Sequence, residues 1–497
     1  MRVRKALSLA AVIGLGLATL TVAAETRDVV GATHISGRYS FGSEDFLNEG
    51  ADRLLGMGTR VIKVWLSFNP KAQYPWNSAW GRKTHTLLAT AQKPYFRELF
   101  AKPFTTFVLI ANGGSSSFQD GFTPEEARDE RSRMDELATY LLTTYAGSGK
   151  TFILQNWEGD HVLRAGLTEE QSPSPKRVQA MIDWLNARQQ GVDDARQRSH
   201  AQGVTVAHAV EVNLVAAAMQ GKVTVTNDVL PRIRPDLVSY SSWDVKFDPV
   251  TLVRALDYIG AHTRPSPIFG SRNVYLGEYG VSAEQLPPGV DQATVIRDLT
   301  EAALGWGVRY TLYWQLYSNE RLREYTGRPR NADMRSLWLI RPDGSKTSMW
   351  NDFAAQMPTR LVPASLLDAS GRAVRASDVT RGESGGLSVY SRRRDRWATF
   401  LLHGPGGPLV DGATVFLQAH NGRYWEASSS QGLAARATRP SAAAAFTLRR
   451  LAGPGTIVSG DAITLEAADG SFLRGDGSTE IGLGAVPSPF TVVYDDF

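Results

Sequence analysis

Two glutamates each stand near the end of an apolar run, where a buried strand would expose its last side chains. Glu158 closes the stretch TFILQNWE (151–158), and Glu278 lies within VYLGEYGV (274–281). A facing pair of carboxyl groups can do acid–base work, because one donates a proton while the other attacks or activates a water. Asp160 is an alternative acid, although an aspartate at that place more commonly caps the helix that follows.

Aromatic, amide and acidic side chains dominate the ends of the other apolar runs. We predict that these residues contact the substrate; they are His34, Trp65, Asn112, Asn156, Trp157, Glu211, Tyr240, Trp243 and Trp314. Aromatic rings stack on the CH faces of sugars, while amides and carboxylates bond sugar hydroxyls. Glycoside hydrolysis needs two carboxyl groups, one to protonate the leaving oxygen and one to attack the anomeric carbon or activate a water. The sequence therefore favours a polysaccharide or oligosaccharide substrate.

Some of these residues also have a structural interpretation. His34 would serve equally well in packing, and Glu211 suits an orienting or structural role better than nucleophilic attack. Trp157 would help to keep Glu158 protonated by excluding water. The sequence shows no clear cluster of histidine ligands, and chemistry with two carboxyl groups implies neither a metal nor an organic cofactor.

Eight apolar runs alternate with amphipathic segments between residues 29 and 353. The runs cover 29–35, 60–67, 105–112, 151–156, 204–213, 237–244, 273–281 and 310–317, and the clearest helical segments cover 45–58, 124–147, 175–203, 293–307 and 348–357. Runs that are apolar on both faces are typical of parallel strands covered by helices. This order predicts a (β/α)8 barrel rather than an open doubly wound sheet, since HISGR (34–38) is no Gly-rich phosphate turn. In a barrel the C-terminal ends of the strands meet, which would bring Glu158 and Glu278 together.

After residue 358 the helical periodicity stops, and glycine, serine and short strand patterns take over. The segments 366–402, 413–451 and 462–494 are loosely similar to one another. Three units of about 40 residues resemble a β-trefoil, particularly the fascin-like kind; a two-sheet sandwich is the alternative. Tyr424 and Trp425 in this part would either bind glycan or fill the core.

The first residues have the pattern of an export signal. Arg2, Arg4 and Lys5 precede an uncharged apolar run, and Val22–Ala24 offer small residues for cleavage. We expect a signal peptide over 1–24, a barrel over 25–358, a trefoil-like domain over 359–497, and a secreted or periplasmic location. An uncleaved anchor is less favoured, because the apolar run is shorter than the roughly 20 residues of a membrane span.

Net charge and cysteine content limit the partners and the kinds of site that the protein can have. The full chain has a net charge of +4, from 54 basic and 50 acidic residues, but loss of the signal peptide leaves 51 basic and 50 acidic residues. We therefore expect no nucleic-acid partner and, after cleavage, no membrane association. The absence of cysteine excludes disulfides and thiolate metal sites.

Glutamates at the ends of the fourth and seventh barrel strands resemble the catalytic pair of the clan A glycoside hydrolases, which are retaining (β/α)8 enzymes. The resemblance implies that Glu158 is the acid/base and that Glu278, in LGEYG, is the nucleophile. It also implies that Trp314, in YWQLY, forms a sugar subsite, and that 337–353 is the closing loop and last helix.

The sequence departs from this family at two places. Trp157 stands between Asn156 and Glu158, where the family has an asparagine directly before its acid/base. Lys63 and Trp65 stand on the second strand, which in the family commonly ends with an arginine. The alternatives are an inverting hydrolase on the same fold and a non-catalytic glycan-binding protein built of barrel and trefoil.

Overall fold

The computed structural model describes most of the chain after the first 25 residues. It covers residues 26–112, 118–245, 247–357, 359–377, 385–389, 392, 398–405, 409–419, 423–428, 432–437, 440–475 and 479–494. The predicted signal peptide, 1–24, lies outside the described residues.

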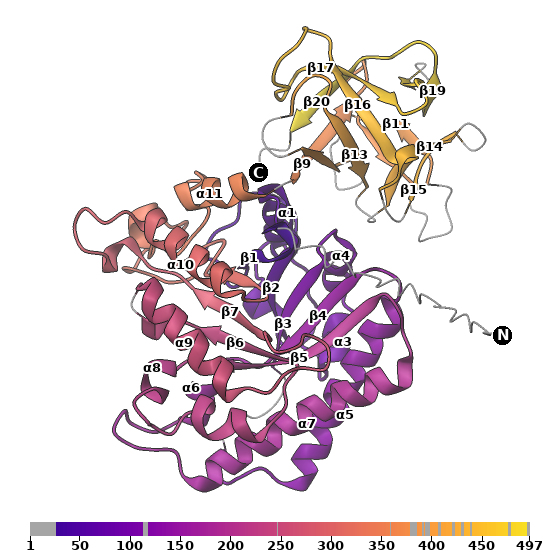
Figure 1. Cartoon of the computed structure of the whole chain (residues 1–497). Coiled ribbons are helices and arrows are strands. Elements are labelled where there is room, and N and C mark those ends of the chain that lie inside the picture. The colour runs from indigo at the N-terminus through magenta and orange to yellow at the C-terminus, as the bar shows by residue number, and fades with distance from the viewer. Residues whose placement is uncertain are drawn as a thin grey trace, which may run out of the picture.

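Eight parallel strands close into a barrel in chain order, β1 to β8, with β8 paired back to β1 (Figure 1). They are β1 Val30–Thr33, β2 Val61–Ser67, β3 Thr106–Asn112, β4 Lys150–Gln155, β5 Val204–Val212, β6 Leu237–Ser241, β7 Val274–Tyr279 and β8 Thr311–Tyr313. All eight coincide with the predicted apolar runs. The strands β1, β6, β7 and β8 are buried along their whole length, because helices cover the outside and side chains fill the inside. The predicted (β/α)8 barrel is confirmed.

Helices surround the barrel, and most of them begin at a side-chain N-cap. They are α1 Phe46–Met57, α2 Pro70–Gln73, α3 Leu87–Ala91, α4 Pro94–Ala101, α5 Pro124–Thr144, α6 Gly159–Leu163, α7 Pro175–Ser199, α8 Val215–Ala218, α9 Pro249–His262, α10 Gln292–Trp306 and α11 Ser348–Gln356. The long helix α5 starts with a capping box between Thr123 and Glu126, which satisfies amides left free at a helix start. The helix α9 was not among the predicted segments, although Asp248 and Pro249 give it an N-cap and a first-turn proline.

An antiparallel all-β domain follows the barrel, as predicted. Its strands are β9 Thr359–Leu367, β10 Val374–Ala376, β11 Leu387–Val389, β12 Phe400–Pro405, β13 Thr414–Gln418, β14 Tyr424–Ser428, β15 Gly432–Ala437, β16 Ala445–Arg450, β17 Ala462–Ala467, β18 Phe472–Gly475, β19 Glu480–Gly484 and β20 Phe490–Tyr494. Among the described strands, β9, β12, β13, β16, β17 and β20 pair in a ring. The pairs β10–β11, β14–β15 and β18–β19 are hairpins attached to that ring.

The core of the β domain is built around Trp425, which is fully buried. Its ring lies 4.5 Å from that of Phe400 in an edge-to-face contact, a favourable geometry for aromatic pairs. Tyr424 is also buried. Both aromatics therefore take the packing role rather than the glycan-binding role that the sequence left open.

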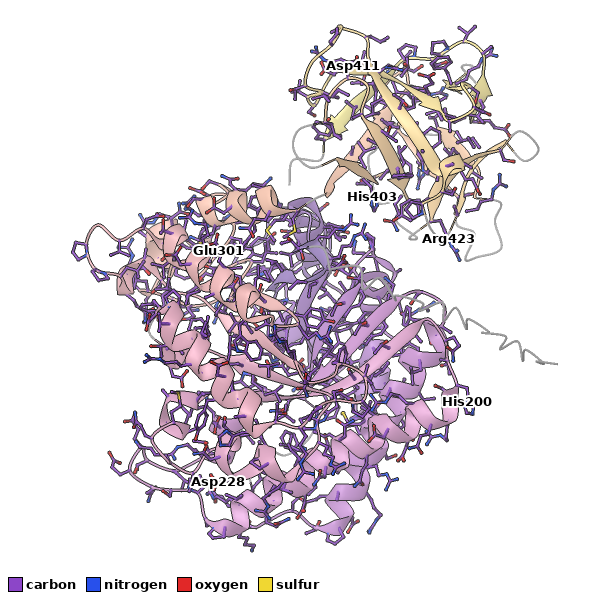
Figure 2. All side chains as sticks on the ribbon, in the orientation of Figure 1. His200, Asp228, Glu301, His403, Asp411 and Arg423 are labelled. Carbon is purple, nitrogen blue, oxygen red and sulfur yellow. The ribbon has the colours of Figure 1, made fainter. Side chains whose placement is uncertain are left out.

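The β domain packs against the end of the barrel where the strands begin. Helix α1 contacts β9, and Figure 2 shows His403 on the side of the β domain that faces the barrel. Burial, together with the positive charges of Arg60 and Arg27, lowers the pKa of His403 to about 3. Arg27 and Arg60 precede β1 and β2, so the domain contact is remote from the C-terminal ends of the strands.

Candidate active site

The C-terminal ends of the barrel strands surround a cleft of about 400 Å³ that contains both predicted catalytic glutamates. Its lining residues are Ile35, Trp65, Trp157, Glu158, Trp243, Glu278, Trp314, Asn319 and Glu320. Four tryptophans thus wall a space that holds two carboxyl groups. The aromatic walls offer the flat apolar surfaces that sugar rings need.

Glu158 stands at the turn between β4 and α6 in an uncommon backbone conformation. Its φ is +38°, in the left-handed region. This conformation is unfavourable in free energy for any residue that has a Cβ atom. The side chain is about one-fifth exposed, and its Oε2 lies 2.6 Å from Nδ1 of His161. This hydrogen bond raises the pKa of the His161 imidazole above its ordinary value. The partial exposure leaves the carboxyl group accessible to solvent and to a molecule in the cleft.

Glu278 is almost fully buried at the end of β7, and both of its oxygens have donors. Lys63 Nζ lies 2.9 Å from Oε1, and the indole Nε1 of Trp243 lies 3.3 Å from Oε2. Lys63 also donates to the carbonyl oxygen of Gly277 at 3.1 Å. The two donors fix the orientation of the carboxylate, and the ammonium group stabilises its negative charge.

Glu211, on β5, lies behind the cleft between these two glutamates. It is fully buried and accepts hydrogen bonds from the Ser241 hydroxyl and from the backbone N–H of Glu158. Its Oε1 lies 3.8 Å from Lys63 Nζ. Burial, with the nearby charge of Glu278, raises the pKa of Glu211 to about 7, although Lys63 acts in the opposite direction.

The four predicted tryptophans all reach the cleft. Trp157 and Trp243 are about two-fifths exposed, whereas Trp65 is nearly buried. Trp65 and Trp314 meet edge to face with ring centres 6.0 Å apart. Large aromatic rings held in this way form rigid walls, and the two exposed rings leave apolar surface free for a ligand.

Five predicted substrate contacts do not line the cleft; they are His34, Asn112, Asn156, Glu211 and Tyr240. His34 is fully buried, packs against Phe46 and Tyr317, and has Nε2 2.7 Å from the Phe46 carbonyl oxygen. Tyr240 is fully buried, and its hydroxyl donates to Asp244. Both residues stand at strand ends as predicted, but their side chains pack in the layer between strands and helices instead of the cleft.

Asn156, which the inserted Trp157 separates from Glu158, is another of these five residues. It is fully buried, and its Oδ1 accepts the N–H of Glu211 at 3.1 Å. The side-chain oxygen is therefore directed at β5 and not at the cleft. Asn112 holds the same turn from the other side, because its Oδ1 accepts the N–H of Trp157 at 3.3 Å.

Asp160, the alternative acid, is bound to backbone instead. It is fully buried and accepts the N–H groups of Asn213, Leu214 and Val225 at 2.8, 3.2 and 2.7 Å. A carboxylate held by three amides is a structural anchor of the β5–α8 loop, and it has no path to a ligand in the cleft.

Three side chains that contact the carboxyl groups are not predicted from the sequence. They are Lys63, His161 and Ser241, none of which is among the predicted site residues. His161 had a usable signal, since it follows Glu158 by three residues, the spacing of neighbours on one helix face. Ser241 had none, because its contact with Glu211 depends on how two different strands align.

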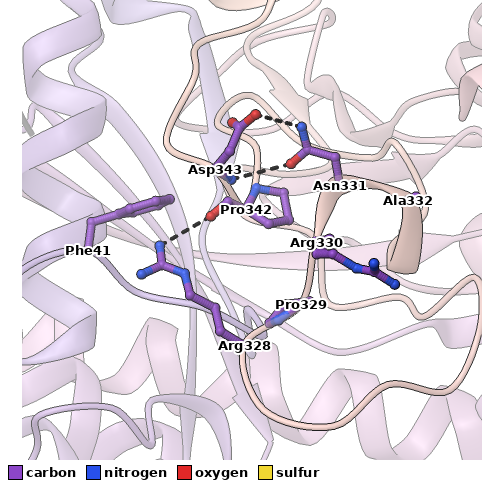
Figure 3. A pocket seen from close by; sticks show the side chains of 8 residues that line it. All are labelled: Phe41, Arg328, Pro329, Arg330, Asn331, Ala332, Pro342 and Asp343. Atoms are coloured by element: carbon purple, nitrogen blue, oxygen red, sulfur yellow. Dashed lines mark hydrogen bonds between the residues drawn. The ribbon is translucent and has the colours of Figure 1, made fainter.

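A second, larger cavity of about 770 Å³ lies between the loops after β1 and β8. Figure 3 shows Arg328 beside Phe41, with its guanidinium 4.8 Å from the ring centre, and Asn331 bonded to Asp343. Arg328 also donates to the Pro342 carbonyl oxygen. These polar groups bond one another and hold the loop, and neither predicted catalytic glutamate is present, so the smaller cleft is the stronger candidate site.

Over the described parts of the chain, no group of three or more His, Cys, Asp or Glu side chains is placed to hold a metal ion. The same residues include no helix long and apolar enough to cross a membrane.

No protein-family model matches the chain. No curated protein matches it either.

Several solved structures are similar in shape at low sequence identity. A GH5_18 protein from Bifidobacterium longum subsp. infantis has 13% identity and a TM-score of 0.45, over 66% of this chain and 78% of that one. A family 39 glycoside hydrolase from Bacteroides cellulosilyticus WH2 has 12% identity and a TM-score of 0.40, over 94% and 82%. An SDF2-like protein from Arabidopsis thaliana has 14% identity and a TM-score of 0.23, over 27% and 92%. These similarities are distant and assign neither an activity nor a substrate.

Proposed function

We propose that this protein is an exported glycoside hydrolase that cleaves a polysaccharide or oligosaccharide with retention of anomeric configuration. One observation carries the proposal: Glu158 and Glu278, from the ends of β4 and β7, line the same cleft, and four tryptophans form its walls. Two carboxyl groups beside aromatic platforms are the minimum that glycoside hydrolysis requires.

In the proposed reaction Glu278 is the nucleophile. Its carboxylate attacks the anomeric carbon while the bond to the leaving oxygen breaks, and Glu158 gives that oxygen a proton. A water then attacks the glycosyl–enzyme ester, Glu158 takes the proton of the water, and Glu278 leaves as a carboxylate. Lys63 and Trp243 hold Glu278 in place through both steps, and the exposure of Glu158 lets it exchange protons.

We also propose a role for each remaining part of the chain. We assign residues 1–24 to a signal peptide, 25–358 to the catalytic barrel and 359–497 to a β-trefoil, with a secreted or periplasmic location. The trefoil assignment is supported by the ring of six strands and the three attached hairpins, which give three four-strand units in chain order.

The direct test is hydrolysis of a broad panel of glycans by the purified protein. We expect Glu278→Gln to abolish turnover and Glu158→Gln to lower kcat by about 10²–10⁴-fold, the typical contribution of a general acid. Glu301→Gln, an identical change on the exposed face of α10 (Figure 2), should leave kcat unchanged. If the wild type and Glu278→Gln bind a glycan equally well and neither hydrolyses it, the result would support the non-catalytic alternative.

Proton NMR of the first product separates the two mechanisms. Retention predicts that the anomer released first has the configuration of the substrate, before mutarotation equilibrates it. Release of the opposite anomer would replace the double-displacement steps by direct attack of water, with Glu278 as the general base.

A further inference from the structure

Glu211 is a third carboxyl group that the proposed reaction leaves unused. It is fully buried on β5, so it cannot contact a substrate in the cleft. A carboxyl group in such a place is costly unless hydrogen bonds or charges satisfy it. Its partners therefore indicate what it does.

One oxygen of Glu211 holds the acid/base candidate. Oε2 accepts the backbone N–H of Glu158, and Glu158 occupies the left-handed region with φ +38°. An N–H donated to a carboxylate makes a strong hydrogen bond. This bond fixes the peptide group that orients the Glu158 side chain toward the cleft. The left-handed conformation of Glu158 is unfavourable and persists only where such contacts stabilise it.

The other oxygen faces the nucleophile candidate through a lysine. Oε1 accepts the Ser241 hydroxyl and lies 3.8 Å from Lys63 Nζ, and the same Nζ lies 2.9 Å from Oε1 of Glu278. Lys63 is fully buried. One ammonium group is thus shared unequally between two carboxyl groups.

We propose that Glu211 is a positioning residue that couples the two candidate catalytic glutamates, holding the Glu158 backbone with one oxygen and the Lys63–Glu278 pair with the other. The roles of Glu158 and Glu278 rest on the proposed function, but the coupling itself is a property of the folded protein. It reaches across strands β2, β4, β5, β6 and β7.

The charges around Glu211 make this coupling depend on pH. The titratable groups that interact electrostatically with Glu211 are Lys63 on β2, Glu278 and Tyr275 on β7, and His161 on α6. Burial raises the pKa of Glu211 to about 7, so it changes charge near neutrality. When it ionises it competes with Glu278 for Lys63, and it accepts the Glu158 N–H more strongly.

The test is NMR of the substrate-free, full-length protein with ¹⁵N and carboxyl ¹³C labels on glutamate. Between pH 5 and 9 we expect the Glu158 amide and the Glu278 carboxyl carbon each to shift at the pH where Glu211 titrates. Both shifts should disappear in Glu211→Gln and persist in Glu301→Gln. If wild-type Glu158 and Glu278 do not respond where Glu211 titrates, the proposal is overturned, whether or not the variant folds.

Kinetics give a second readout once a substrate is known. We expect Glu211→Gln to lower kcat by about 10–100-fold, as for other groups that orient a catalytic residue from behind, with little change in KM. Above pH 7 the wild type should lose activity as Lys63 is drawn away from Glu278, and the variant should not. A kcat equal to that of wild type would contradict the proposal. NMR coupling without any glycan hydrolysis would instead contradict the proposed function alone.

Discussion

At the scale of single residues, the placement of Lys63 decides how the cleft is charged. Its buried ammonium group lies between Glu278 and Glu211, and removal would leave buried carboxylates without a cation. We expect Lys63→Met to lose about 3–5 kcal/mol of unfolding free energy at pH 8 and less at pH 5, because Glu211, whose pKa burial raises to about 7, is then protonated and no longer needs the cation. Urea unfolding at the two pH values measures this difference.

Lys102→Met is the matched control for this substitution. Lys102 forms another buried pair, at 2.7 Å from Asp52, in the part of the barrel near α1. It should destabilise the protein in a similar way but leave kcat/KM unchanged at temperatures where the variant is folded. Lys63→Met should instead lose hydrolysis even when fully folded. Equal activity of the two variants would remove Lys63 from the site.

The sequence predicts the ends of strands better than the direction of side chains. Glu158 and Glu278 were found because two apolar runs end beside them, and the barrel topology brings such ends together. His34 and Tyr240 also stand at strand ends, yet both are buried among other elements. A shift of one residue in a strand reverses the face of a side chain, and the sequence does not fix that register.

At the scale of elements, the close approach of α6 to β5 sets the position of Glu158. Gly159 begins α6, and a Cβ on it would lie 2.2 Å from the Glu211 carbonyl oxygen. Gly159→Ala must therefore move the α6 start and the adjacent Glu158. We expect a loss of about 1–3 kcal/mol in unfolding free energy, as for other overpacked sites, and a fall in kcat that exceeds the change in KM.

Gly305→Ala provides the control within a helix. A Cβ at Gly305, in α10, meets no atom within 4 Å, so alanine should raise stability by about 0.5–1 kcal/mol through its better helix propensity. Thermal unfolding and steady-state kinetics of both variants check the pair. Unchanged kinetics in Gly159→Ala would show that the α6 start does not position Glu158.

Helices and strands with a clear periodic pattern of apolar residues were predictable from the sequence. Features that depend on tertiary contacts were not. The capping box of α5 and the apolar runs of the strands are local patterns that the sequence displays. The left-handed turn at Glu158 is not, because it depends on the N–H contact with Glu211, 53 residues away. The inserted Trp157 was visible in the sequence, but its effect, the burial of Asn156, required the neighbouring strand.

At the scale of the whole molecule, the cleft and the β domain occupy opposite ends of the barrel. The lining residues of the cleft all belong to the barrel, whereas His403 on β12 faces Arg27 and Arg60 before the first two strands. The change from barrel to β domain was predictable from the loss of helical periodicity. The surface by which the two parts meet was not, since neither sequence pattern marks it.

His403→Asn tests this separation through the pH dependence of stability. Burial holds the folded-state pKa of His403 at about 3, below the roughly 6.5 of an unfolded chain. Above pH 6.5 the residue is neutral in both states and adds no pH dependence. As the pH falls below 6.5, only the unfolded chain takes up the proton, so wild-type stability declines by about 1.4 kcal/mol per pH unit until the pH approaches 3.

The variant lacks this proton uptake, so its stability relative to wild type should improve by about 2 kcal/mol between pH 7.5 and pH 5. At pH 7.5 it should be the less stable protein, because it loses the 2.8 Å contact of His403 with Gln418. His200→Asn, at an exposed position with φ +46° that asparagine tolerates, is the control for the replacement of a histidine far from the domain contact. Urea unfolding across this pH range measures both variants. Because the cleft lies at the other end of the barrel, His403→Asn should keep the kcat/KM of wild type, and a loss of activity in the folded variant would show that the two ends communicate.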